Sequence, residues 1–211
     1  MNTTNPIIPQ MSIQILLPDA IDRRFRRRVK TLPGASWPAW GGHITLVPAF
    51  VPTCPPQEVF DRVAQATGQF VAFRIRLAEA VAEGDITRPH FHTVFIQLDD
   101  PDSEDHQTLA RLQKAIFAAL APVRDAAKPE LDAVPFKPHL TLALGVGDSE
   151  AARLVNALRS EPMQAEFLVD AVWLVLRWPG EGRDPRVDRV PVPLAKPALP
   201  PSELPPGTLS D

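Results

Sequence analysis

Two short segments of the sequence each place a threonine two residues after a histidine. HITL begins at His43 within WGGHITLVPAF, and HLTL begins at His139 within FKPHLTLALG. In a β-strand, residues i and i+2 point to the same face, so each histidine would project together with its threonine, Thr45 or Thr141. The surrounding apolar and β-branched residues are typical of strands, which favours this arrangement.

Two imidazoles and two hydroxyls on neighbouring faces suit displacement at phosphorus. With a pKa near 6.5, one histidine can take a proton from a nucleophile while the other gives one to a leaving group. Each role is typically worth about 10²–10⁴ in rate. The threonine hydroxyls can donate hydrogen bonds to anionic oxygens. This chemistry requires no metal and no other cofactor.

A third copy of the pattern, HQTL from His106, lies in a different context. Its neighbours keep the apolar spacing of a helix, and the pattern predicts a helix over 102–126. Two residues along a helix correspond to about 200° of rotation, so the side chains of His106 and Thr108 would diverge. We interpret this copy as chance.

Proline-punctuated apolar patterns predict alternating strands and helices along the chain. Strands are predicted at 12–17, 43–50, 70–80, 91–98, 137–145, 166–178 and 186–194, the last two as an antiparallel pair. Helices are predicted at 19–32, 56–67, 102–126 and 148–161.

The elements after the two motifs occur at similar offsets, which indicates an internal repeat. The sequence therefore predicts an α+β chain with two pseudo-symmetric lobes, each with a small antiparallel sheet and helices on its outer face. One domain is expected over 10–194, after an N-terminal extension at 1–9. The Pro-rich segment 195–211 is expected to be disordered.

Composition limits the classes of partner. The net charge of −3 argues against binding of a long nucleic-acid duplex, which usually needs a basic surface. The Arg-rich segment 22–30 is read as a solvated helix face or a phosphate-steering patch. The chain has one cysteine, Cys54, no apolar run of membrane length and no secretory signal. We therefore expect a cytoplasmic protein without membrane contact, and we expect it to be a monomer.

The paired motifs in a duplicated α+β chain of this length resemble the 2H phosphoesterase superfamily, also called 2′-5′ RNA ligase-like or cyclic phosphodiesterase-like. The segments GGHITLVPAFVP and HLTLALG carry the resemblance, which covers roughly 10–194. It implies a groove between two sheets, lined by His43, Thr45, His139 and Thr141. It also implies metal-independent hydrolysis of 2′,3′-cyclic phosphates of nucleotides or RNA ends. We expect His43 to protonate the leaving 3′ oxygen and His139 to activate water, giving a 2′-phosphate.

Two further residues are candidates for substrate binding. Phe91 is expected opposite the apolar face of strand 91–98, where it would stack on a base or pack in the core. Arg177 alternates with Trp173 and Val175, and would hold a phosphate if that face lines the groove. Otherwise it is a surface arginine.

Three alternatives remain open at the level of sequence. The first is cleavage or ligation of 2′-5′-linked oligonucleotides or cyclic dinucleotides, and the second is a non-catalytic module that binds a nucleotide or RNA end. The third is a metal hydrolase that uses His90 and His92 with Asp99 and Asp100, although no third histidine lies at ligand spacing.

Overall fold

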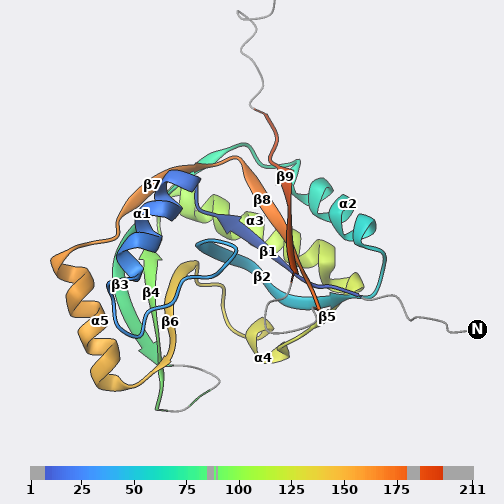
Figure 1. Cartoon of the computed structure of the whole chain (residues 1–211). Helices are drawn as coiled ribbons and strands as arrows, with labels where there is room; N and C mark the ends of the chain where they lie inside the picture. The colour runs from blue at the N-terminus through green and yellow to red at the C-terminus, as the bar shows by residue number, and fades with distance from the viewer. Residues whose placement is uncertain (1–7, 85–87, 89, 180–185, 197–211) are drawn as a thin grey trace, which may run out of the picture.

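The structure is a computed structural model that describes residues 8–84, 88, 90–179 and 186–196 (Figure 1). It is an α+β fold, as predicted. The strands are β1 (Gln10–Leu16), β2 (His43–Pro52), β3 (Phe73–Gly84), β4 (His92–Leu98), β5 (Arg124–Ala126), β6 (His139–Val146), β7 (Ala165–Val169), β8 (Ala171–Trp178) and β9 (Arg186–Pro193). The helices are α1 (Asp19–Val29), α2 (Pro56–Thr67), α3 (Glu104–Leu120), α4 (Pro129–Asp132) and α5 (Asp148–Ser160), with a 3₁₀ turn η1 (Ala121–Val123).

The strands form one curled sheet made of two equivalent halves. Its order is β7-β3-β4-β6-β2-β1-β8-β9, with β5 paired to β2, and the pairings between these strands are antiparallel. Read outward from the centre, β6-β4-β3-β7 mirrors β2-β1-β8-β9. The two predicted small sheets are therefore present, and they are joined where β2 meets β6.

The two halves exchange strands. β3 follows β2 and α2 in the chain but lies beside β4, and β8 follows β7 but lies beside β1. The crossing after β7 occurs at Asp170, so the single strand predicted over 166–178 is wrong. The predicted final antiparallel pair is confirmed, because β8 and β9 pair along their whole length.

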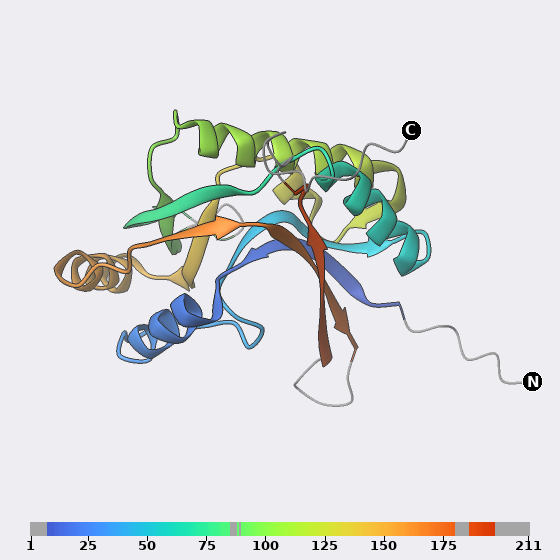
Figure 2. The same cartoon turned by 90° about the horizontal axis from the view of Figure 1, so that it is seen from above.

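Two helix pairs cover the sheet. α2 packs against α3, and α1 reaches α5, where the Arg28 guanidinium donates to the Ala157 carbonyl at 3.1 Å. Figure 2 shows the two pairs on opposite sides of the curled sheet. None of the helices in the described residues is long and apolar enough to span a bilayer.

The helix predicted over 102–126 is shorter in the structure. The Ser103 hydroxyl caps α3 by accepting from the His106 backbone N–H at 3.2 Å, and α3 ends at Leu120. Pro122 lacks a backbone N–H, and there the chain tightens into η1 before β5 pairs with β2.

The strands that carry the two motifs follow the predicted alternation. Ile44 and Leu46 on β2, and Leu140 and Leu142 on β6, are at most 1% exposed and belong to the core. The side chains between them on each strand therefore point away from the core, to the opposite face.

A tight loop before β2 fixes where that strand begins. The Asp22 carboxylate on α1 accepts hydrogen bonds from the Gly42 backbone N–H at 2.6 Å and from the Trp37 indole N–H at 2.9 Å. Gly41 has φ +104°, a conformation that favours glycine. A Cβ on Gly42 would overlap the Trp37 ring and lie 2.9 Å from Leu17 Cδ1.

This packing predicts that Gly42→Ala destabilises the protein. The added methyl overlaps Trp37, so we expect the free energy of unfolding to fall by about 1–3 kcal/mol in urea denaturation. Gly84→Ala is the matched control, since a Cβ there meets nothing within 4 Å. Equal effects of the two substitutions would contradict the packing of this loop.

Candidate active site at the junction of the two half-sheets

The junction between β2 and β6 brings the two motifs together. Its register contains one pair, Ile44 opposite Leu140, in antiparallel orientation. In that register, His43 lies beside Thr141 and Thr45 lies beside His139. The four side chains share the face opposite the buried Ile44 and Leu140, and each is partly buried. Each histidine therefore neighbours the threonine of the other motif.

The two imidazoles are held in the same way. His43 Nδ1 lies 3.1 Å from the Gly41 carbonyl oxygen, and His139 Nδ1 lies 2.7 Å from the Lys137 carbonyl oxygen. A carbonyl can only accept, so in each ring Nδ1 carries the proton and donates it. This leaves each Nε2 as the atom that can take up or release a proton.

Burial lowers the pKa of both histidines below the ordinary value. For His43, desolvation is the largest cause; the Gly41 carbonyl raises its pKa and His139 lowers it further. For His139, desolvation again dominates; the Lys137 carbonyl and the Glu83 carboxylate raise its pKa, and the Lys137 ammonium lowers it. Both rings therefore favour the neutral form near pH 7, and a positive charge on His139 further disfavours one on His43.

Each histidine ring contacts an aromatic ring, and that aromatic ring in turn contacts a cationic side chain. The Trp40 ring lies 5.7 Å from the His43 ring at an interplanar angle of 31°, and the Arg177 guanidinium lies 5.3 Å from the Trp40 centroid. On the other side, the Phe95 ring lies 4.7 Å from the His139 ring, and the Lys137 ammonium lies 5.3 Å from the Phe95 centroid. The two half-sheets thus repeat a histidine–aromatic–cation arrangement.

The register places Arg177 on the face of the junction. On β1, Gln14 lies opposite Thr45 of β2 on one side and opposite Trp173 of β8 on the other. The β1–β8 pairing continues without a register shift to Gln10, which lies opposite Arg177. Arg177 and Trp173 therefore share the face of Thr45. This is the orientation that the phosphate-binding hypothesis for Arg177 requires.

Gln14 is a buried polar residue beside the site that the sequence reasoning missed. Its side chain is 4% exposed, and its Nε2 donates to the Ser12 hydroxyl at 3.0 Å. Its Oε1 is buried without a partner in the described part of the chain. A glutamine within the apolar strand MSIQILL was the available signal, since it marks the face opposite the core.

Phe91 lies away from the two histidines. It precedes β4 and is 44% exposed. The Arg88 guanidinium packs over its ring, 5.9 Å from the ring centroid. The aromatic residue at His139 is Phe95, which lies opposite Thr141 in the β4–β6 pairing. In a strand, Phe95 points to the same face as Phe91, because the two are four residues apart. The same alternation could therefore have identified Phe95 as a candidate on that face. Base stacking by Phe91 stays a prediction.

The third tetrapeptide and the proposed metal ligands do not join the junction. His106 lies on α3, as predicted. His92 pairs with Gly84 at one end of β4 and its Nε2 lies 2.5 Å from an Asp148 oxygen, whereas Asp99 follows the other end of that strand. Within the residues that the structure describes, no three His, Cys, Asp or Glu side chains are grouped to hold a metal ion.

Comparison with solved structures shows that the fold is shared with known proteins. Solved structures with similar folds include a phosphoesterase (18% identity, TM-score 0.56, covering 90% of this chain and 99% of that one). TT0787 of Thermus thermophilus (16% identity, TM-score 0.54, 87% and 97%) and E. coli LigT complexed with 3′-AMP (17% identity, TM-score 0.51, 89% and 99%) are also similar.

Sequence comparison identifies the family. None of the curated proteins matches the chain significantly. The family model of the 2′-5′ RNA ligase superfamily, however, matches residues 17–180, which span both motifs and most of the sheet. The predicted resemblance is confirmed, and the chain belongs to the 2′-5′ RNA ligase superfamily, the 2H phosphoesterases.

Proposed function

We propose that this protein hydrolyses 2′,3′-cyclic phosphates of nucleotides or RNA ends to 2′-phosphates, without a metal, by acid–base catalysis with His43 and His139. The observation that carries the proposal is the β2–β6 junction, where each Nδ1 donates to a backbone carbonyl. Both Nε2 atoms are thereby available for proton transfer on one face of the sheet. Two such groups provide the base and the acid that a displacement at phosphorus needs.

The proton transfers balance with one water molecule as the second reactant. His139 Nε2 takes a proton from the water molecule while the water oxygen forms a bond to phosphorus. The bond between phosphorus and O3′ breaks, and His43 Nε2–H protonates that oxygen. The product is the 2′-phosphate, and His139 returns its proton to solvent while His43 regains one.

Neighbouring side chains would hold the phosphate during this step. The hydroxyls of Thr45 and Thr141 donate to its non-bridging oxygens, where negative charge increases in the transition state. Arg177, fixed over Trp40, contributes positive charge on the His43 side. These donors belong to three strands of the sheet, β2, β6 and β8, so the sheet itself keeps their spacing.

Two observations support a small substrate: the net charge of the chain and the nucleotide complex of a protein with a similar fold. A net charge of −3 favours a nucleotide or a short RNA end over a long duplex. E. coli LigT, which has a similar fold, is known as a complex with 3′-AMP, and this supports a nucleotide as the ligand here. A single chain contains both motifs, so a monomer is sufficient for the proposed reaction.

Replacement of either histidine tests the proposal. His43→Ala and His139→Ala should each lower turnover of nucleoside 2′,3′-cyclic monophosphates by at least about a hundredfold, because each removes one proton transfer. His92→Gln is the control, since His92 lies at the far end of β4. Wild-type activity in both alanine variants would contradict two-histidine catalysis. Inactivity of the wild type on all four nucleosides would favour 2′-5′-linked substrates.

The dependence of kcat/KM on pH gives a second test. Activity rises with pH as His139 becomes neutral, and falls as His43 loses its proton, so the curve is bell-shaped. Burial lowers both pKa values, so the maximum should lie below pH 6.5, the ordinary value for histidine. EDTA should leave the curve unchanged. A maximum well above pH 7, or loss of activity with EDTA, would exclude the proposed mechanism.

A further inference from the structure

A pocket of about 730 Å³ lies on the β4 side of the β2–β6 junction and reaches the two residues that precede His139. Its wall includes Gln97, which lies directly opposite His139 in the β4–β6 pairing, and Lys137 and Pro138, which precede His139 in the chain. Glu79 and the partly buried Phe136 ring also line it. A pocket of this size next to a reacting group is large enough for a nucleoside.

A β-bulge turns Glu79 toward this pocket. Leu77 pairs with Leu98 but Ala80 pairs with Ile96, so β3 has one extra residue opposite Gln97. As a result, Glu79 meets Gln97, and the Gln97 carboxamide donates to a Glu79 carboxylate oxygen at 3.1 Å. Gln97 is thus placed between Glu79 and the catalytic His139.

The hydrogen bond between Gln97 and Glu79 fixes what the pair can recognise. A carboxylate only accepts, so the NH₂ group of Gln97 must face Glu79 and its carbonyl oxygen must face away. The second Glu79 oxygen and the Gln97 oxygen remain as acceptors. A carboxylate has about four lone-pair sites and Gln97 occupies one of them, so the two Glu79 oxygens can still accept two neighbouring donors of a ligand, and the second Gln97 N–H stays free.

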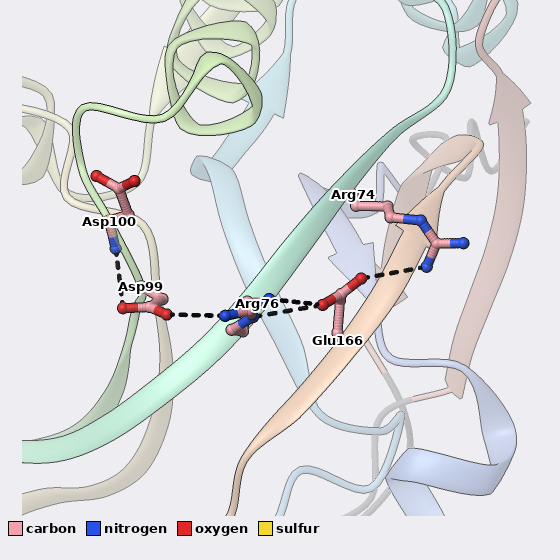
Figure 3. Close-up of polar contacts among 5 residues, drawn as sticks. All are labelled: Arg74, Arg76, Asp99, Asp100 and Glu166. Carbon is pink, nitrogen blue, oxygen red and sulfur yellow. Dashed lines mark hydrogen bonds and ion pairs between the residues drawn. The ribbon is translucent and has the colours of Figure 1, made fainter.

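The cations at this pocket are engaged with carboxylates. The Arg76 guanidinium lies between Glu166 at 3.1 Å and Asp99 at 3.5 Å, and Glu166 also contacts Arg74 (Figure 3). The Lys137 ammonium forms an ion pair with Glu83. A second phosphate would find these charges already compensated, so the pocket suits an uncharged base better than a phosphate.

The donors must come from the base of the substrate. In a 2′,3′-cyclic phosphate, both secondary hydroxyls of the ribose are esterified. Among the four bases, guanine alone presents two adjacent donors, N1–H and N2–H₂, on its Watson–Crick edge, whereas adenine and cytosine place an acceptor beside their amino group. Phe136 offers an apolar ring against which a base can stack.

We propose that Gln97 and Glu79 make this site selective for guanine, so that guanosine 2′,3′-cyclic phosphate or an RNA end that terminates in guanosine is the preferred substrate. The inference rests on the proposed function, because it assumes that the cyclic phosphate lies between His43 and His139. In this arrangement Glu79 and Gln97 determine specificity and take no part in proton transfer.

Turnover of the four nucleoside 2′,3′-cyclic monophosphates tests this selectivity. For the wild type, kcat/KM should be at least about tenfold higher for guanosine than for the other three, the effect expected of hydrogen bonds to a charged acceptor. Glu79→Gln should remove most of that preference by lowering kcat/KM for guanosine toward the values of the other three nucleosides. Glu58→Gln, the same change at an ion pair on α2, should keep the wild-type ratio. Equal turnover of the four, or a preference that Glu79→Gln leaves intact, would overturn the inference.

Binding measured by calorimetry separates this inference from the proposed reaction. Guanosine 2′-monophosphate should bind about tenfold more tightly than adenosine 2′-monophosphate to the wild type, and equally to Glu79→Gln. This result without turnover would support the guanine site and reject the cyclic phosphodiesterase reaction. Turnover without a guanine preference would support the cyclic phosphodiesterase reaction and reject the guanine site. Absence of both binding and turnover would reject the reaction and the guanine site together.

Discussion

The meeting of β2 and β6 is the constraint on which the rest of the structure depends. One antiparallel pair, Ile44 with Leu140, joins the two half-sheets, and the equivalence of the halves is centred on it. Because the pairing is antiparallel, each histidine lies beside the threonine of the other motif. The register of a single residue pair thereby brings two segments that are far apart in sequence to one face of the sheet.

Each half-sheet supports its histidine by the same physical means but with different residues. A backbone carbonyl two residues earlier fixes the tautomer, and an aromatic ring with a cation lies behind the imidazole. The difference lies in the charges: Arg177 reaches the His43 side, whereas Glu83 and Glu79 lie on the His139 side. The proposed phosphate contact of Arg177 and the proposed guanine selectivity of Glu79 both rest on this asymmetry.

The sequence predicted those features that depend on local periodicity. The spacing of His43 and Thr45, and the burial of Ile44 between them, follow from the alternation of a strand. The neighbours of the site depend on register and could not be predicted in this way. Gln97 meets Glu79 through a bulge in β3, and the break at Asp170 sends β8 to the other half-sheet. Neither the bulge nor the break interrupts the apolar pattern enough to be visible in the sequence.

The exchange of strands between the halves also affects how the chain folds. β1 is the first strand of the chain, yet one of its two neighbours is β8, in which Trp173 lies opposite Gln14. During synthesis, the half-sheet that contains His43 therefore waits for nearly the whole chain before it is complete. Contacts this distant in sequence slow folding, because a long loop must close before they form. Neither half of the sequence encodes a separable folding unit, even though the two halves repeat the same architecture.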